Sequence, residues 1–151
     1  MSELKTRLRS DLTAAMKARN SLTLGTLRMV LTAVGNEEVA GKSARELSDA
    51  EVITVLTREA KKRRESAEAF ASAGRDELAA KEKAEGEIIA GYLPAALSDD
   101  EIADIVRAAI AETGAEGPRA MGSVMKVVQP KVAGRAEGGR VAAEVKRQLA
   151  D

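Results

Sequence analysis

The residues best suited to hold a ligand lie between Met121 and Arg140, where cations, glycines and an apolar stripe occur together. A loop around Gly134 to Gly139 precedes a predicted last helix, whose free N-terminal amides, flanked by Arg135 and Arg140, could hold a nucleic-acid phosphate. The alternative is a tight connection in which the glycines only supply positive φ. With two cations near the C-terminus added, the candidate phosphate-binding residues are Lys126, Lys131, Arg135, Gly138, Arg140, Lys146 and Arg147.

The apolar stripe of this stretch consists of Met121, Val124, Met125 and Val128. This spacing places them on one helix face, which indicates a buried ridge and not a cofactor pocket. Gly122 lies inside the same predicted helix, where glycine costs about 1 kcal/mol relative to alanine. Either close helix packing or the close approach of a partner would explain it, and we favour packing.

Catalytic chemistry has few candidates, because the chain contains neither Cys nor His. The usual nucleophile and base pairs and most zinc or copper sites therefore cannot form. Glu37 and Glu38 project in different directions from a helix, and Asp99 and Asp100 are assigned to helix capping. We expect no catalytic residue, no metal site and no cofactor, and therefore no enzymatic activity of the chain on its own.

The formal net charge of the 151 residues is zero, but the charge is unevenly distributed. From Pro118 to Asp151, seven cations face three anions, a local excess of about four positive charges. Such a region suits a few phosphate contacts, although not indiscriminate coating of nucleic acid. A second basic run, Arg58 to Arg64, is interpreted as a solvated helix face, with a functional basic surface as the alternative.

The composition favours helices, because Ala, Glu, Lys, Arg and Leu dominate and only three prolines occur. Apolar periodicity predicts helices over residues 3–18, from about 24 to 39, from 48 to 74 and from about 75 to 93. The third begins at a capping box formed by Ser48 and Glu51. Short connections between these helices predict an N-terminal four-helix bundle over residues 1–94.

A second domain is expected to follow Pro94, which disfavours helix at the residue before it. Ser98 and Glu101 form another capping box, and Gly114 suits the end of that helix. Pro130 should end or kink the next helix. A last helix, with Val141, Val145 and Leu149 facing inward, completes a small three-helix C-terminal domain over residues 95–151, so the fold class is all-α.

No apolar run near the N-terminus approaches the length of a signal peptide or a membrane span. We therefore expect a soluble cytoplasmic protein that does not enter a membrane.

Further short stretches are distributed along the chain: Arg28 and Met29, Asn36 to Glu38, Lys61 to Arg64, Ala73 to Arg75, Lys81 to Ala84, Tyr92 to Pro94, Met121 to Lys126, Pro130 and Lys131, and Gly134 to Gly138. Together they cover essentially the whole chain and resemble the YqeY-like proteins. Glu137 departs mildly from the pattern, where Asp is expected.

The resemblance implies an N-terminal helical bundle and a C-terminal module similar to the C-terminal region of GatB. GatB is the tRNA-binding subunit of the aspartyl/glutamyl-tRNA amidotransferase, whose catalytic parts have no counterpart in these 151 residues. The expected function is thus that of a non-catalytic tRNA-binding or tRNA-associated accessory protein.

Two other functions stay open. One is a protein interaction adapter that docks on an amidotransferase or an aminoacyl-tRNA synthetase. The other is carbon–nitrogen ligase activity with glutamine as amide donor, a label that homology would transfer from the larger enzyme. Since Phe70 and Tyr92 are the only aromatic residues and are expected to be buried, RNA recognition would use shape and phosphates, not base stacking.

Overall fold

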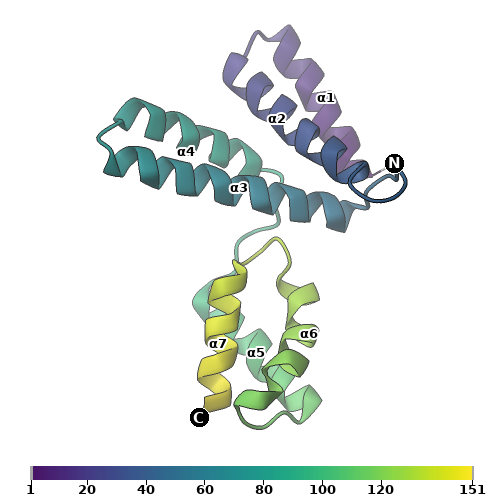
Figure 1. The fold of residues 1–151 in the computed structure, drawn as a ribbon, viewed down its shortest axis with the longest axis vertical. Helices are drawn as coiled ribbons and strands as arrows, with labels where there is room; N and C mark the ends of the chain where they lie inside the picture. The colour runs from purple at the N-terminus through teal and green to yellow at the C-terminus, as the bar shows by residue number, and fades with distance from the viewer. Residues whose placement is uncertain (1, 151) are drawn as a thin grey trace. The chain divides into compact units, whose positions relative to one another are not determined.

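A computed structural model describes residues 2–150, which form seven α-helices, one short 3-10 helix and no strand. The predicted all-α class is confirmed for this part of the chain. The chain divides into two compact units, Met1–Leu93 and Pro94–Asp151. Figure 1 shows helices α1 to α4 in the first unit and α5 to α7 in the second.

The four N-terminal helices form two hairpins (Figure 1). The first pairs α1 (Glu3–Lys17) with α2 (Ser21–Glu38), and the second pairs α3 (Asp49–Ser72) with α4 (Asp76–Ala90). Helix α2 contacts both helices of the second hairpin. The core that joins the hairpins consists of Leu8, Leu27, Val30, Val34, Leu47, Val52, Val55, Leu56 and Ile89.

Local signals in the sequence placed the start and end of α3 correctly. The Ser48 amide donates to the Glu51 carboxylate at 2.8 Å, and the Glu51 amide donates to the Ser48 hydroxyl at 3.2 Å, which completes the capping box. Gly74 follows α3 with φ +74, a conformation that favours glycine. The apolar stripe that predicts α1 consists of Leu4, Leu8, Leu12 and Met16, but Met16 in the last turn is 51% exposed.

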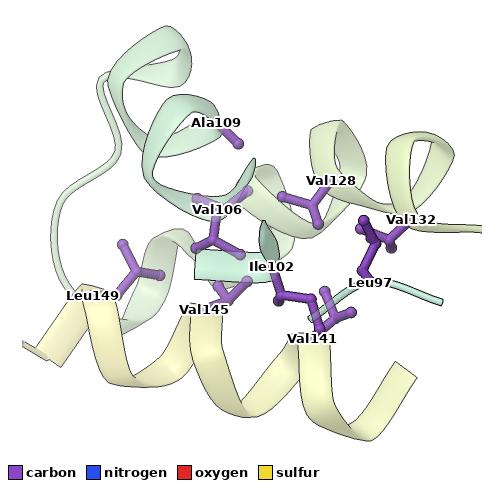
Figure 2. Close-up of a cluster of buried hydrophobic side chains, with 10 residues drawn as sticks. Leu97, Ile102, Val106, Ala109, Val128, Val132, Val141, Val145 and Leu149 are labelled. Carbon is purple, nitrogen blue, oxygen red and sulfur yellow. The ribbon is translucent and has the colours of Figure 1, made fainter. Parts of the chain in front are cut away.

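The C-terminal unit contains α5 (Asp99–Thr113), a 3-10 helix (Pro118–Ala120), α6 (Met121–Val132) and α7 (Gly138–Ala150). The three α-helices pack around one core, and Figure 2 shows the α7 side chains facing those of α5. The buried residues are Leu97, Ile102, Val106, Ala109, Val124, Val128, Val132, Val141, Val145 and Leu149.

The ends of α5 match the sequence prediction, whereas the end of α6 does not. Ser98 and Glu101 form the predicted capping box, and Gly114 closes α5 with φ +64. Helix α6 was expected to end or kink near Gln129; it does not end there but continues to Val132. Because Val132 is 4% exposed and belongs to the core, we attribute the extra turn to burial of this side chain, which offsets the amide hydrogen bond that proline cannot make.

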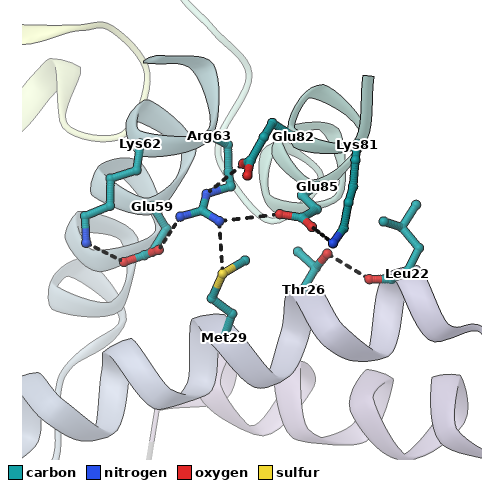
Figure 3. A network of polar contacts seen from close by, with 9 residues as sticks. All are labelled: Leu22, Thr26, Met29, Glu59, Lys62, Arg63, Lys81, Glu82 and Glu85. Atoms are coloured by element: carbon teal, nitrogen blue, oxygen red, sulfur yellow. Dashed lines mark hydrogen bonds and ion pairs between the residues drawn. The ribbon is translucent and has the colours of Figure 1, made fainter. Parts of the chain in front are cut away.

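A cluster of charged side chains joins α2, α3 and α4 in the N-terminal unit (Figure 3). The guanidinium of Arg63 on α3 lies 3.4 Å from the carboxylate of Glu85, 3.5 Å from that of Glu82 and 4.0 Å from that of Glu59. It also donates to the Met29 sulfur on α2 at 3.1 Å. The Arg63 side chain is only 17% exposed, so three carboxylates are held near one cation in a largely desolvated setting.

Replacing Arg63 with methionine should reduce the free energy of unfolding by about 3–5 kcal/mol, because Glu82 would lose its only paired cation within residues 2–150. Glu59 and Glu85 would keep only the exposed cations Lys62 and Lys81. Lys62→Met is the matched control, since the Lys62 side chain is 62% exposed although it contacts Glu59 at 3.1 Å. That variant should lose about 1 kcal/mol or less in the same urea titration. Equal losses in the two variants would show that the buried cluster has no special role.

Candidate nucleic-acid interface

Helix α6 has a buried face and an exposed face with different chemistry. Val124 and Val128 are fully buried. The exposed face carries Gly122, Ser123 and Lys126, which together with Met125 and Gln129 line an open hollow of about 490 Å³. Lys126 forms no ion pair with any residue of the described chain. This face therefore offers one uncompensated cation beside polar side chains.

Gly122 on this face is not explained by helix packing. A Cβ atom built at this position would meet no atom within 4 Å. The preferred sequence interpretation, close packing against a neighbouring helix, is therefore wrong. The other interpretation, close approach of a partner to the α6 backbone, is the one that the open space allows.

The N-terminus of α7 is also exposed. Gly138 is its first residue, and Cβ atoms at Gly138 and Gly139 would likewise have nothing within 4 Å. The carbonyl of Glu137 accepts from the amides of Arg140 and Val141 at 3.1 and 3.2 Å. An anion can therefore approach the first amides of the helix, but the Glu137 carboxylate lies next in sequence and would repel it.

Two candidate cations are engaged by acidic residues of α5. Lys131 lies 3.6 Å from Glu112, and Arg140 lies 2.5 Å from Asp99. All four side chains are exposed, and such pairs contribute about 1 kcal/mol or less. A phosphate could therefore displace either carboxylate at small cost.

The other two arginines have structural contacts. The Arg135 Nε donates to the Ala95 carbonyl at 3.2 Å, and the Leu97 amide donates to the Arg135 carbonyl at 2.7 Å, which fastens the turn after α6 to the segment before α5. Arg147 donates to Glu144 at 2.6 Å. Hydrogen bonds from Arg147 and then Gln148 lower the pKa of Glu144 to about 2.

The helix packing thus divides the seven candidate residues into groups. Lys126 on α6 and Lys146 on α7 are exposed and have no ion pair among residues 2–150. The two helices pack against each other. Lys131, Arg140 and Arg147 form ion pairs within the unit, Arg135 donates to a backbone carbonyl, and Gly138 is the exposed first residue of α7. The free basic surface is therefore smaller than the sequence predicted.

The charge count from the sequence overlooked the acidic residues in and just after α5. Between Pro94 and Asp151 there are eight lysines and arginines and nine aspartates and glutamates, so the unit has a formal charge of 8 − 9 = −1. The local excess counted from Pro118 left out the six acidic residues between Asp99 and Glu116. A charge count over the whole predicted domain would have revealed this compensation.

The N-terminal basic run is not the uniformly solvated face that we expected. Arg63 is turned inward, as described above, whereas Arg58 and Lys62 are exposed.

The expected burial of both aromatic residues is also wrong, because Phe70 and Tyr92 are half-buried. The Tyr92 hydroxyl donates to Asp11 at 2.5 Å, and Arg7 lies 4.6 Å from its ring centre. Burial and the Asp11 contact raise the pKa of Tyr92 above its ordinary range.

Among the described residues, no group of three or more acidic side chains is placed to hold a metal ion. Within the same residues, no helix combines the length and the apolar character needed to cross a membrane.

These features define an all-α chain of two helical units with exposed cations on the second unit. The family model described as Yqey-like protein matches residues 5–149. The chain therefore belongs to the YqeY-like family, as the sequence resemblance predicted.

Fungal relatives share the name "Altered inheritance of mitochondria protein 41, mitochondrial". The relative from Pyrenophora tritici-repentis is 32% identical over 134 residues, which cover 86% of this chain and 71% of that protein. The one from Clavispora lusitaniae is 40% identical over 98 residues, or 63% of this chain and 55% of that protein. For Saccharomyces cerevisiae, the identity is 36% over 88 residues, 57% of this chain and 46% of that protein. The chain thus matches about half the length of the last two relatives.

These names contradict the predicted cytoplasmic location, because each relative is named as a mitochondrial protein. The prediction rested on the lack of a long apolar run near the N-terminus. That criterion detects secretory signals and membrane spans, but it does not distinguish the cytoplasm from the interior of an organelle.

The open space at Gly122 gives a stability prediction. Gly122→Ala should raise the free energy of unfolding by about 0.5–1 kcal/mol, because alanine reduces the entropy lost on helix formation and meets no neighbour. Gly114→Ala is the contrasting control, since φ +64 there should make alanine destabilising by about 1–2 kcal/mol. Thermal unfolding of both variants measures this, and a destabilised Gly122→Ala protein would contradict the open site.

Proposed function

We propose that the chain is a non-catalytic accessory protein that binds tRNA through its C-terminal unit. The observation that carries this proposal is the exposed face of α6, where Gly122 lies beside open space and one turn before the unpaired Lys126. A helix glycine without a packing partner has a cost in stability. Close approach of an RNA backbone, with Lys126 on a phosphate, would account for that cost.

Further contacts would come from the neighbouring helix. Lys146 supplies a second unpaired cation on α7. The exposed amides around Gly138 can receive a phosphate, and Lys131 and Arg140 can join once their exposed carboxylate partners are displaced. Arg135 and Arg147 are assigned mainly to holding the unit together. The proposed interface therefore makes few phosphate contacts, and its affinity should be moderate.

The scarcity of aromatic residues, one Phe and one Tyr in the chain and neither of them fully exposed, supports recognition of a folded RNA by its backbone. Tyr92 is engaged with Asp11 and Arg7, and it belongs to the N-terminal unit. Sequence-specific reading of single strands normally uses exposed aromatic side chains on which bases stack. A tRNA presents a folded backbone that a few cations can contact without base stacking.

A second candidate function is a protein adapter that docks on an amidotransferase or an aminoacyl-tRNA synthetase. The formal charge of −1 on the whole C-terminal unit favours this candidate, because a strongly basic domain is the usual electrostatic sign of nucleic-acid binding. In this case, the cations of α6 and α7 would only be solvated. A purified protein partner that stays bound after nuclease treatment would support the adapter.

The two candidates differ in their salt dependence. We expect tRNA affinity to fall as salt rises, and Lys126→Glu combined with Lys146→Glu should weaken binding and reduce the slope of log K against log salt by about one per lysine. Fluorescence anisotropy with labelled tRNA measures both quantities.

The matched control for this experiment is Lys17→Glu combined with Lys83→Glu, which makes the same charge change at exposed lysines of the N-terminal unit. This control should keep most of the wild-type slope. Binding that is insensitive to salt, or equal losses in the two double variants, would contradict the assignment of the interface to α6 and α7.

A further inference from the structure

A groove between α2 and α3 in the N-terminal unit has no part in the proposed RNA contact. Its volume is about 410 Å³, within the range of ligand sites in proteins. Met29 and Ala33 of α2 and Val55 of α3 supply its apolar lining. The Met29 sulfur is held by Arg63 at 3.1 Å (Figure 3), so this end of the groove is fixed by the charged cluster.

The groove is long enough for a short peptide. Its α2 wall runs from Met29 to Glu37, which corresponds to about 12 Å along the helix axis, and Ala40, just beyond the end of α2, extends it. A smaller hollow of about 210 Å³ shares Glu37, Val55 and Arg58 with it. The depression therefore continues past the ion pair in which Arg58 lies 3.5 Å from Glu37.

Asn36 provides a polar group suited to peptide backbone. Its side chain lines the groove, is exposed and forms no hydrogen bond with any residue of the described chain. A carboxamide offers both a donor and an acceptor, which match the carbonyl and amide of a peptide unit. The backbone groups inside a helix are already paired with each other, so an extended segment is the occupant that can use Asn36.

The outermost charges of the groove are positive. Arg58 and Lys62 lie one turn apart on α3, and their side chains are 61% and 62% exposed. The carboxylate nearest to Lys62 is that of Glu59, whose side chain is 8% exposed and also faces Arg63. Glu37, which pairs with Arg58, is 41% exposed, so each cation already has a carboxylate partner, although the cations reach furthest into solvent. An acidic occupant would therefore compete for two exposed cations at the rim, whose pairs contribute about 1 kcal/mol or less.

We propose that this groove binds an extended acidic segment of a protein partner, with about five residues between α2 and α3. Apolar side chains of the segment contact Met29, Ala33 and Val55, its backbone pairs with Asn36, and its carboxylates meet Arg58 and Lys62. The proposal does not depend on RNA binding, because it uses residues of the other unit.

The test uses the full chain and a random library of twelve-residue peptides displayed on phage. Selection should enrich peptides that combine Asp or Glu with apolar residues. Binding of a labelled enriched peptide should weaken roughly tenfold in Asn36→Ala, the effect expected for one lost hydrogen bond of this kind. Arg58→Gln should also weaken it, whereas Lys83→Gln, at an exposed lysine on α4, should not.

Several results would overturn the proposal. Enrichment of basic peptides, or of none, would do so, and so would an acidic peptide that binds Asn36→Ala as well as wild type. Thermal unfolding should be unchanged in Asn36→Ala, because this side chain has no partner within residues 2–150. If Arg58→Gln instead lowers tRNA affinity while no peptide is enriched, the groove is a nucleic-acid surface and the peptide proposal fails.

Discussion

The arrangement of the N-terminal helices depends on the guanidinium of Arg63. This group contacts carboxylates of α3 and α4 and the Met29 sulfur of α2. Apolar packing brings the two hairpins together, but a hydrophobic core alone would tolerate small shifts between them. Directional contacts around one largely buried cation restrict those shifts. They also fix Met29 and Glu59, which line the α2–α3 groove.

In the C-terminal unit, ion pairs between helices reduce the number of cations that are available to a partner. Glu112 and Asp99 of α5 engage Lys131 and Arg140, so the helix that supplies much of the core also supplies compensating charge. The uncompensated cations are fewer than the composition of the last third suggests. The proposed RNA contact in this unit and the proposed peptide groove in the other would let the chain bind two partners.

The sequence predicted those features that depend on neighbours along the chain. Both capping boxes and the positive φ of Gly114 follow from contacts within a few residues, and apolar periodicity identified the buried face of α7. Features that depend on other helices were missed. Pro130 does not end α6 because Val132 is buried, and Arg63 turns inward because α4 places carboxylates beside it. The site residues themselves could be proposed from sequence, but their pairing with α5 could not.

The most direct test of the RNA proposal is the tRNA affinity of Gly122→Ala, measured by anisotropy at fixed salt. A methyl group at this position meets no protein atom within 4 Å, so any loss of affinity cannot be attributed to a disturbed core. If RNA approaches the α6 backbone, Gly122→Ala should bind tRNA more weakly than wild type while being at least as stable. Unchanged affinity in the variant would show that RNA does not approach the α6 backbone at Gly122, and would contradict the central claim.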